Sequence, residues 1–276
     1  MHDIPAAGVM SYNVNNCTYE YNEIHNIALK EADNGAYYNY GRWETYGNIW
    51  RYNFNHHNNR SNGFYSDDGD SGDVYYRNIV QGCTLGILFG GGHDNIAYQN
   101  IFIKNKGQSI DDRGISRNYR LGTDYEKRLR AFNPDVEPWL SYGKKLKETH
   151  GFTTNLWSEV LSPDYKPEHP NGSGMFDNVG VATGSFNKPK NGNVRVENNV
   201  LLKSIEEAKF ENYAQMDLRS TSPEILKVFP DLNEQFPKMG LRKDSFRLVV
   251  PSRAEFGGLS DRGQSGASWN EDQMID

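Results

Sequence analysis

Short apolar stretches bounded by Gly and Asn recur along the chain and define its predicted elements. The first kind of stretch follows a glycine and alternates apolar with polar positions, which predicts a strand with one buried face. These strands follow Gly8, Gly35, Gly63, Gly86 and Gly107. The second kind ends near an asparagine, and these residues are Asn22, Asn53, Asn78, Asn100 and Asn199. Each unit is therefore a strand, a turn, a second strand that ends near an Asn, and a loop.

The spacing of these units predicts a solenoid of stacked parallel β coils, which is an all-β fold. Units of roughly 20–50 residues are too small to bury a face alone and must stack on their neighbours. Coils in such a stack lie about 4.8 Å apart, so residues in register form ladders. We expect the five asparagines to form a side-chain amide ladder at one corner, because Asn tolerates left-handed conformations and bonds to nearby backbone. We interpret these asparagines as structural residues rather than as catalytic ones.

The pattern divides the chain into three predicted regions. Residues 1–115 hold the β coils, residues 116–192 form a partly helical insertion with loops, and residues 193–276 hold the last strands and an irregular tail. The charged stretch 124–132 is predicted to be helical, and residues 244–252 are predicted to form a last strand that closes the solenoid. An open coil is a sheet edge that needs a cap. The first residues offer none, so we expect upstream β-helix coils from a longer parent chain.

Composition narrows the class of protein. The chain has 276 residues, a formal net charge of −6, 36% hydrophobic residues, 17 Tyr and 5 Trp, which is typical of a turn-rich β protein. Mild acidity without basic runs argues against nucleic acid as a partner. No stretch approaches the roughly 18 apolar residues of a membrane span, and the first residues do not resemble a signal peptide. Cys17 and Cys83 are interpreted as buried thiols rather than as a disulfide.

A column of acidic residues appears when the units are aligned on their glycines. Asp67-Asp68 and Asp111-Asp112 fall in register, with Gly90-Gly91 between them. Two rungs of about 4.8 Å place the acid pairs roughly 10 Å apart along the axis. Glycoside hydrolysis uses two carboxylates about 5–5.5 Å apart for retention or about 6.5–9.5 Å apart for inversion, and this estimate decides neither. Repulsion within a pair favours one protonated acid at neutral pH, as a general acid requires.

Residues that flank the acid pairs are candidates for substrate contacts. Alternation places Tyr37 and Tyr65 in one outward column with Leu88 and Ser109, and aromatic rings suit the apolar face of a sugar. Arg113 follows the second pair and is expected to hold one partner ionised or to orient substrate. The remaining candidates are Asp33, Arg42, Trp43 and His93.

Other interpretations of these residues remain open. Asp in an Asp-Asp-Gly sequence is a common turn residue, although two pairs in register across a glycine rung favour a site. Clustered Asp oxygens also suit calcium, so a Ca²⁺ site is the second functional interpretation. We otherwise expect no cofactor and no other metal. His93 is as compatible with a structural role as with a role in chemistry.

The motifs around these residues resemble a known group of proteins. They are Asp33-Asn-Gly-Ala-Tyr, Gly41-Arg-Trp, Gly63-Phe-Tyr-Ser-Asp-Asp-Gly, Gly90-Gly-Gly-His-Asp-Asn and Ile110-Asp-Asp-Arg-Gly. Over about residues 2–115 the chain resembles the right-handed parallel β-helix proteins of bacterial polysaccharide breakdown, and most of all the β-helical glycoside hydrolases of the α-L-fucosidase and xylanase type. The resemblance implies a right-handed parallel β-helix, a polysaccharide or oligosaccharide substrate and a secreted or periplasmic location. It places the catalytic acids among Asp67, Asp68, Asp111 and Asp112, without choosing within either pair.

Three hypotheses of function follow from the sequence. The first is a glycoside hydrolase that uses one carboxyl from each acid pair. The second is a polysaccharide lyase or uronate epimerase, which needs cations to neutralise a substrate carboxylate and a Lys, Arg, His or Tyr base. The acid-rich, Lys-poor candidate site disfavours it. The third is a non-catalytic carbohydrate-binding β-helix.

Overall fold

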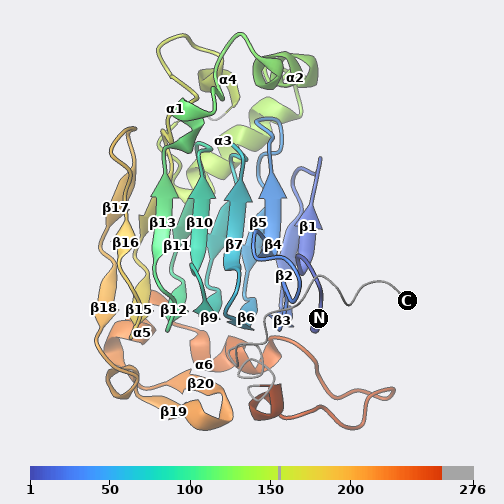
Figure 1. The fold of residues 1–276 in the computed structure, drawn as a ribbon, viewed down its shortest axis with the longest axis vertical. Coiled ribbons are helices and arrows are strands. Elements are labelled where there is room, and N and C mark those ends of the chain that lie inside the picture. Colours follow the sequence, from blue (N-terminus) through green and yellow to red (C-terminus); the bar gives the residue numbers. More distant parts are fainter. Residues whose placement is uncertain (155–156, 257–276) are drawn as a thin grey trace, which may run out of the picture.

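The chain folds as a right-handed parallel β-helix in the computed structural model, which describes residues 1–154 and 157–256 (Figure 1). The first sheet consists of β1 (Val9–Ser11), β4 (Gly35–Tyr40), β7 (Asn62–Asp67), β10 (Ile87–Gly90), β13 (Gln108–Asp111) and β16 (Phe186–Asn187). The second consists of β2 (Thr18–Glu20), β5 (Ile49–Arg51), β8 (Val74–Tyr76), β11 (Ile96–Tyr98), β14 (Gly174–Phe176) and β17 (Arg195–Glu197). The third consists of β3 (Glu23–His25), β6 (Phe54–Asn58), β9 (Ile79–Cys83), β12 (Ile101–Ile103), β15 (Val179–Val181) and β18 (Val200–Leu202). Each strand pairs in parallel with strands one coil away, so the predicted solenoid is confirmed.

An asparagine ladder marks the corner between the second and third sheets, as predicted. The side-chain amide of each Asn donates to the next one along the axis; Asn53 donates to Asn78, and Asn78 to Asn100, both at 3.0 Å. Each acceptor oxygen also receives a backbone N–H from the preceding coil. Asn178 is a further rung, not predicted from the sequence, between Asn100 and Asn199. The ladder thus satisfies buried polar groups that would otherwise be costly.

The left-handed residue at this corner is the one before each ladder asparagine, rather than the asparagine itself. These residues are Tyr21, Tyr52, Arg77, Gln99, Asp177 and Asn198, with φ between 52° and 57°. A left-handed conformation costs a residue with a side chain roughly 1–2 kcal/mol. The hydrogen bonds of the ladder offset that cost and fix the direction in which the chain enters the third sheet.

The interior of the coils is filled by aromatic rings in register. Tyr37 stacks on Phe64 with ring centroids 5.1 Å apart, and Tyr19 stacks on Trp50 at 3.7 Å. Tyr37, Phe64 and Trp50 are 0–1% exposed. Stacked rings suit a parallel coil because the strand spacing of about 4.8 Å brings equivalent side chains into contact.

A helical insertion leaves the stack after β13 and lies along one edge of the coils (Figure 1). It contains α1 (Arg113–Ser116), α2 (Asp124–Phe132), α3 (Trp139–His150) and α4 (Trp157–Val160). The prediction of a helix over residues 124–132 is confirmed. Leu129, Leu146 and Trp157 pack against side chains from the coils. The coil pattern resumes at Gly174 with β14, inside the range 116–192 that the sequence pattern predicts as insertion.

A second segment, after β18, lies along the opposite edge and covers the third sheet (Figure 1). Its elements are η1 (Glu206–Ala208), β19 (Phe210–Asn212), η2 (Tyr213–Gln215), β20 (Asp217–Ser220), α5 (Pro223–Val228), α6 (Leu232–Gln235), η3 (Phe236–Lys238) and η4 (Arg253–Phe256). Leu218, Phe229 and Phe236 pack on outward-facing residues such as Ile79 and Ile101. The prediction of a closing strand at 244–252 is wrong, because this stretch contains no strand and its apolar side chains are exposed, Phe246 by 99%.

Two further predictions concern the cysteines and membrane-spanning segments. Cys17 and Cys83 are free thiols, and Cys83 is buried while Cys17 is half-buried. In the part of the chain that the structure describes, no helix has the length and apolar character needed to cross a membrane.

Candidate active site

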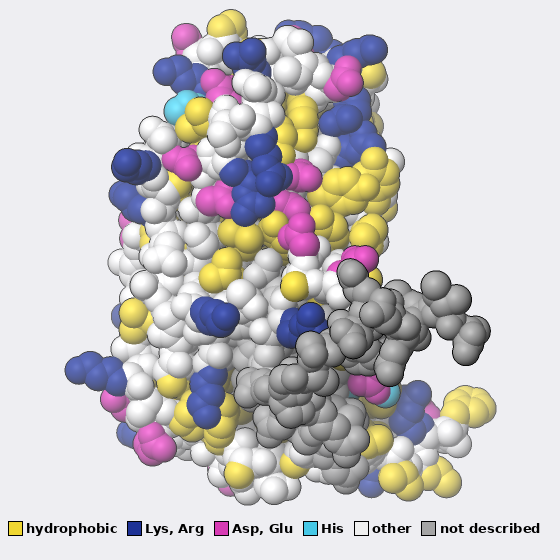
Figure 2. Space-filling model, viewed as in Figure 1, with side chains coloured by type: hydrophobic (Ala, Val, Ile, Leu, Met, Phe, Trp, Pro, Cys, Tyr) yellow, Lys and Arg dark blue, Asp and Glu magenta, His cyan; other side chains and the backbone are white. Residues whose placement is uncertain are grey.

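The acid pairs lie in register on the outward face of the first sheet, at the carboxyl ends of its strands. Gly90 pairs with Asp111, and Phe89 pairs with Ser66, so that Asp67 is the residue next to Gly90. On this face, Asp/Glu and Lys/Arg side chains gather beside a group of hydrophobic side chains (Figure 2). We call Asp67, Asp68, Asp111 and Asp112, with Arg113 and Arg117, the acid cluster.

Arg113 joins the two halves of the acid cluster. Its Nη1 lies 3.0 Å from Oδ1 of Asp67, and its Nη2 lies 2.6 Å from Oδ2 of Asp111. Its Nη1 also donates to the hydroxyl of Tyr65 at 3.0 Å. The planar guanidinium therefore lies between the two carboxylates, as its fork of donors allows. One carboxylate from each acid pair thus converges on a single residue.

Asp67 is the more enclosed of these two carboxylates. Its side chain is 5% exposed, whereas that of Asp111 is 29% exposed. Burial, followed by the charge of Asp68, raises the pKa of Asp67 above its usual range. Hydrogen bonds from Tyr38, at 3.0 Å, and from the backbone N–H of Asp68 act in the opposite direction. The net effect favours a protonated Asp67 more than in a surface aspartate.

The second member of each pair points to a separate set of partners. Asp68 contacts Arg117 and accepts a hydrogen bond of 2.8 Å from the hydroxyl of Tyr119. Asp112 accepts two hydrogen bonds from Asn191, one from the backbone N–H and one from the side-chain amide. These contacts link the coil to the insertion and to the loop before β17. The two members of each pair thus have different partners: Asp67 and Asp111 contact Arg113, and Asp68 and Asp112 contact Arg117 and Asn191. The sequence alone did not distinguish the members.

Gly90 leaves the space that the acid cluster needs. A Cβ atom at this position would lie 2.9 Å from Oδ1 of Asp67. At Gly91, with φ of 77°, a Cβ would lie 2.6 Å from Cγ of Arg113 and 2.5 Å from the backbone nitrogen of Gly114. The glycine rung therefore admits both the Asp67 carboxyl and the Arg113 side chain.

The predicted outward position of Tyr37 is wrong, and Tyr38 takes that place. Tyr37 pairs with Phe64 and lies in the coil interior, while Tyr38 pairs with Tyr65. The error is one residue of register, because Gly35 pairs with Asn62 rather than with Gly63. A slip of one residue reverses the face of every side chain in a strand.

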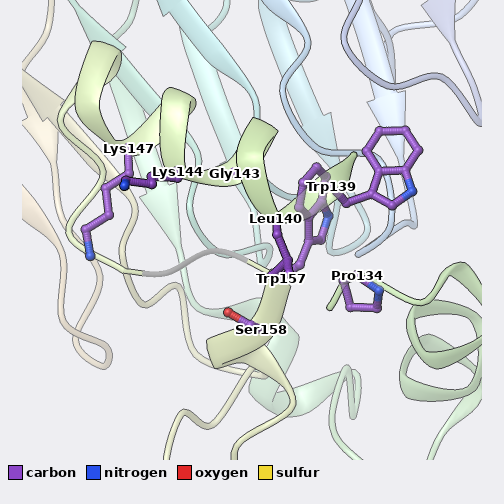
Figure 3. A pocket seen from close by; sticks show the side chains of 8 residues that line it. All are labelled: Pro134, Trp139, Leu140, Gly143, Lys144, Lys147, Trp157 and Ser158. Atoms are coloured by element: carbon purple, nitrogen blue, oxygen red, sulfur yellow. The ribbon is translucent and has the colours of Figure 1, made fainter. Parts of the chain in front are cut away.

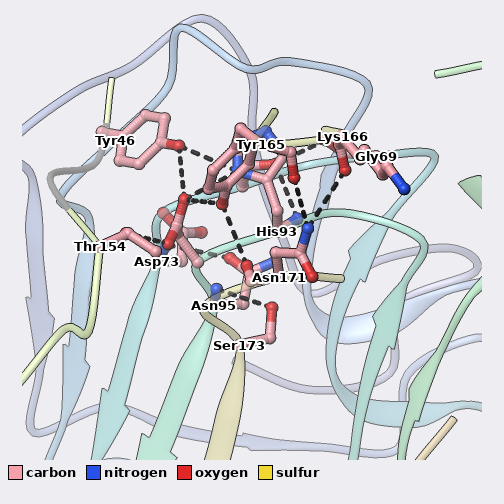
Figure 4. A network of polar contacts seen from close by, with 12 residues as sticks. Tyr46, Gly69, Asp73, His93, Asn95, Thr154, Tyr165, Lys166, Asn171 and Ser173 are labelled. Carbon is pink, nitrogen blue, oxygen red and sulfur yellow. Dashed lines mark hydrogen bonds and ion pairs between the residues drawn. The ribbon is translucent and has the colours of Figure 1, made fainter. Parts of the chain in front are cut away.

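Trp43 and His93 are also fully buried, so neither presents a surface to a substrate in this structure. Nδ1 of His93 lies 2.9 Å from Asp94 and 3.0 Å from the Tyr46 hydroxyl. Asp94 also accepts hydrogen bonds from Thr154 and from Tyr165, the latter at 2.6 Å. Figure 4 shows Tyr46, His93, Thr154 and Tyr165 within this network. This network connects the insertion to the loop between β10 and β11. Among the described residues, Nε2 of His93 has no hydrogen-bond partner.

Of the remaining predicted residues, Tyr65 contacts the acid cluster, and Asp33 and Arg42 lie in the loops before and after β4. Tyr65 is 4% exposed and accepts the hydrogen bond from Arg113. Arg42 forms an ion pair of 3.3 Å with Glu44 and lies over the ring of Tyr12. Asp33 is exposed in the loop before β4, close enough to Tyr38 for its charge to raise the pKa of that hydroxyl, after burial and Asp67.

Two aspartates beneath the acid cluster were not singled out in the sequence. Asp70 and Asp73 lie in the loop after β7, exposed by 2% and 0%. Burial raises the pKa of Asp70 well above its usual range and that of Asp73 to about 7. Asp70 accepts from Thr45 at 3.1 Å, and Asp73 accepts from Asn48 at 3.1 Å and also from Asn39. The repeated acids in 67–73 were the available signal, but the burial of Asp70 and Asp73 depends on tertiary contacts that the sequence does not show.

Within residues 1–154 and 157–256, no group of three or more His, Cys, Asp or Glu side chains is arranged to hold a metal ion. A small hollow of about 270 Å³ lies in the insertion, lined among others by Trp139, Trp157, Lys144 and Lys147 (Figure 3). None of the residues that line it belongs to the acid cluster.

Comparison with known proteins gave no match: no family model matches the chain, and the searches of curated proteins and of solved structures found no match.

Proposed function

We propose that this protein is a glycoside hydrolase that cleaves glycosidic bonds in a plant or microbial polysaccharide, with Asp67 as general acid and Asp111 as its ionised partner. The observation that carries the proposal is the convergence of these two carboxylates on Arg113 at one face of the β-helix. Two carboxyl groups in different environments are the usual requirement of this chemistry. The motif resemblance to β-helical α-L-fucosidases and xylanases supports the same reaction class.

The two roles follow from the two environments. A general acid must hold a proton at the working pH, and burial raises the pKa of Asp67 in that direction. The base or nucleophile must be ionised and reachable, and Asp111 is both more exposed and in contact with a guanidinium through two nitrogens. Arg113, itself 25% exposed, would move aside or turn toward substrate hydroxyls when a sugar enters.

In the proposed reaction, Asp67 gives its proton to the glycosidic oxygen as the bond from that oxygen to the anomeric carbon breaks. Asp111 removes a proton from a water molecule, whose oxygen forms the new bond on the opposite face of the sugar. Asp67 ends ionised and Asp111 protonated, and proton exchange with solvent restores both. The products are a hemiacetal and the free leaving-group alcohol.

Because Asp111 activates a water molecule in this scheme, the scheme predicts inversion rather than retention. The two aspartates are two strands apart, which places their backbones about 10 Å from one another. Retaining enzymes need carboxylates only about 5–5.5 Å apart, whereas inverting enzymes leave about 6.5–9.5 Å for a water molecule. A guanidinium already fits between the two groups. Proton NMR of the first-formed anomer would distinguish the outcomes, and a retained configuration would contradict this assignment.

Isosteric substitution of the four aspartates tests the proposal. Asp67→Asn and Asp111→Asn should each lower kcat by at least about a thousandfold, because each removes a group that acts only in the transition state. Asp68→Asn and Asp112→Asn are the matched controls and should lose much less. Xylan and pectic oligosaccharides are the substrates to screen. Full activity in all four variants would exclude the two-carboxylate mechanism.

A polysaccharide lyase or uronate epimerase is the second candidate, and the presence of Arg113 and Arg117 in the acid cluster favours it. Such enzymes need cations to neutralise a uronate carboxylate. Both arginines, however, already contact aspartates of the cluster, which reduces their capacity to bind another anion. A rise in ultraviolet absorbance from an unsaturated product on polygalacturonan would favour the lyase.

Glycan binding that survives all four Asp→Asn changes, without turnover by the parent protein, would instead indicate a non-catalytic binding protein.

A further inference from the structure

A row of tyrosine rings leads from the acid cluster toward β1 on the outward face of the first sheet. The ring of Tyr12 stacks on that of Tyr40 at 5.0 Å, and Tyr40 lies 5.8 Å from Tyr38. Tyr38 then contacts Tyr65 at 5.3 Å. The three strands that carry or precede these residues, β1, β4 and β7, are hydrogen-bonded neighbours. The rings therefore form one continuous surface across successive coils.

This surface ends at the proposed general acid. The hydroxyl of Tyr38 donates to Oδ2 of Asp67 at 3.0 Å. At the other end the surface is open, since Tyr12 is 41% exposed and the neighbouring Met10 is 55% exposed. The hydrophobic group beside the charged cluster in Figure 2 lies on this same face. A molecule that lies on the outer rings is thus directed toward Asp67.

The charges around the rings favour an uncharged occupant. Arg42 lies over the Tyr12 ring, but Glu44 pairs with it at 3.3 Å and also contacts Arg128 at 3.5 Å. Asp33 adds an exposed carboxylate close to Tyr38. A polyuronate would meet carboxylates on both sides of Tyr38, from Asp33 and from the acid cluster, and would be repelled.

We propose that Tyr12, Tyr40 and Tyr38 form a binding platform for consecutive residues of a neutral glycan chain, which runs across the coils into the acid cluster. Tyrosine suits this role because it presents an apolar ring and a polar hydroxyl on one rigid side chain. Flat ring faces pack against the C–H faces of sugars, while the hydroxyls and Arg42 reach sugar oxygens. This inference rests on the proposed function and adds the class of substrate and the direction from which it enters.

Binding to the Asp67→Asn protein tests the platform without degradation of the probe. In native gels that contain arabinoxylan, β-glucan, galactan or polygalacturonan, at least one of the three neutral polymers should retard the protein. Tyr12→Ala should weaken that binding roughly three- to tenfold, the range expected for loss of one aromatic contact. Tyr12→Phe keeps the ring and should bind more tightly than Tyr12→Ala.

Tyr21→Ala is the matched control, because Tyr21 stacks on Tyr52 at 5.3 Å in a comparable ring pair away from the first sheet. It should leave glycan binding unchanged. Equal retardation of the Tyr12→Ala and parent proteins would overturn the platform. Retardation by polygalacturonan alone, or by none of the four polymers, would also overturn it.

Failure of the platform and failure of the proposed function are distinguishable. If Tyr12→Ala binds normally while Asp67→Asn and Asp111→Asn are inactive, catalysis stands and the platform fails. If the tyrosine variants lose glycan binding while the parent protein has no hydrolase activity on any bound polymer, the platform stands and the hydrolase assignment fails.

Discussion

The guanidinium of Arg113 donates a hydrogen bond of 3.0 Å to the carboxylate of Asp67, although 46 residues separate them in the sequence. The register of the coils brings them together, because β7 and β13 are both neighbours of β10. Arg113 also neutralises Asp111 at the same place. Arg113 is therefore the residue whose removal should change the ionisation of the proposed site most directly.

Replacement of Arg113 should shift the pH dependence of activity. A nearby cation stabilises ionised Asp67, so Arg113→Gln should raise the pKa of Asp67 further. A general acid is lost when it deprotonates, and the alkaline limb of the kcat/KM profile should move to higher pH by about one unit. Tyr38→Phe, which removes a hydrogen bond to the same carboxylate, should shift this limb in the same direction by less. An alkaline limb that does not move in either variant would argue against Asp67 as the acid.

A methyl group at Gly90 should impair activity more than stability. The added Cβ would lie 2.9 Å from Oδ1 of Asp67, so the carboxyl must move. Displacement of a catalytic group by about 1 Å costs roughly a hundredfold in rate. We expect Gly90→Ala to lower kcat on this scale, as measured by steady-state kinetics, with a smaller loss of stability in thermal unfolding, because the Cβ would also lie 3.2 Å from the backbone oxygen of Ser66. A fully active Gly90→Ala enzyme would show that the position of Asp67 does not matter.

Gly143→Ala is a control from the insertion with the opposite expectation. Gly143 lies inside α3, and an added Cβ would make an ordinary contact of 3.6 Å with Trp157. Glycine inside a helix is less favourable than alanine by roughly 0.5–1 kcal/mol. Urea unfolding should show Gly143→Ala to be more stable by about this amount, with unchanged activity. A loss of stability would indicate that α3 packs more tightly on Trp157 than these distances imply.

Loss of a central ladder rung should destabilise the protein strongly. Asn78 accepts two hydrogen bonds from Asn53 and donates to the carbonyl of Trp50 at 2.8 Å. Asn78→Ala leaves these buried groups without partners, and we expect a loss of about 3 kcal/mol in the free energy of unfolding. Asn22→Ala, at the open end of the ladder, should cost less, because Asn22 only donates within it. Equal effects in urea unfolding would argue against a cooperative ladder.

Acid should destabilise the fold through a column of stacked histidines. His25 lies between His2 and His56, with ring centroids 4.9 and 4.7 Å away, and Glu23 and Arg253 face the same column. Burial, followed by the charge of His56, lowers the pKa of His25 from 6.5 to about 3. Below about pH 6.5, His25 therefore binds a proton in the unfolded chain but stays unprotonated in the folded chain until the pH approaches 3. The stabilisation is complete above pH 6.5 and is lost progressively as the pH falls toward 3.

Thermal unfolding across this range measures the effect. The Tm should fall by several degrees between pH 7 and pH 4.5, and His25→Gln should reduce the slope because Gln does not titrate. A slope identical to that of the parent protein would assign the acid sensitivity to other groups, such as His56, whose pKa is also lowered by burial. The buried Asp70 and Asp73 act in the opposite direction, since burial raises the pKa of both.

The predicted positions of residues in the first sheet were right where the strand register was aligned correctly and wrong where it was not. Asp67, Gly90 and Asp111 were aligned correctly, because glycines precede their strands at equivalent positions. Tyr37 was placed on the wrong face, because the prediction aligned Gly35 with Gly63. In the structure Gly35 pairs with Asn62, one residue earlier. Asn178 was missed for a related reason: a long insertion separates it from Asn100, so the repeat could not be followed across.

The sequence by itself determined the repeat, since strand periodicity, the corner asparagines and the glycine rung are local properties of each unit. It also determined that two acid pairs would share a face. Only the tertiary structure decided which acid of each pair converges on Arg113, and which of the nearby residues are buried. Side-chain burial and hydrogen bonding depend on contacts between distant segments, such as Arg117 with Asp68 and Thr154 with Asp94. A repeat pattern carries no information about such contacts, because the insertion that makes them interrupts the repeat.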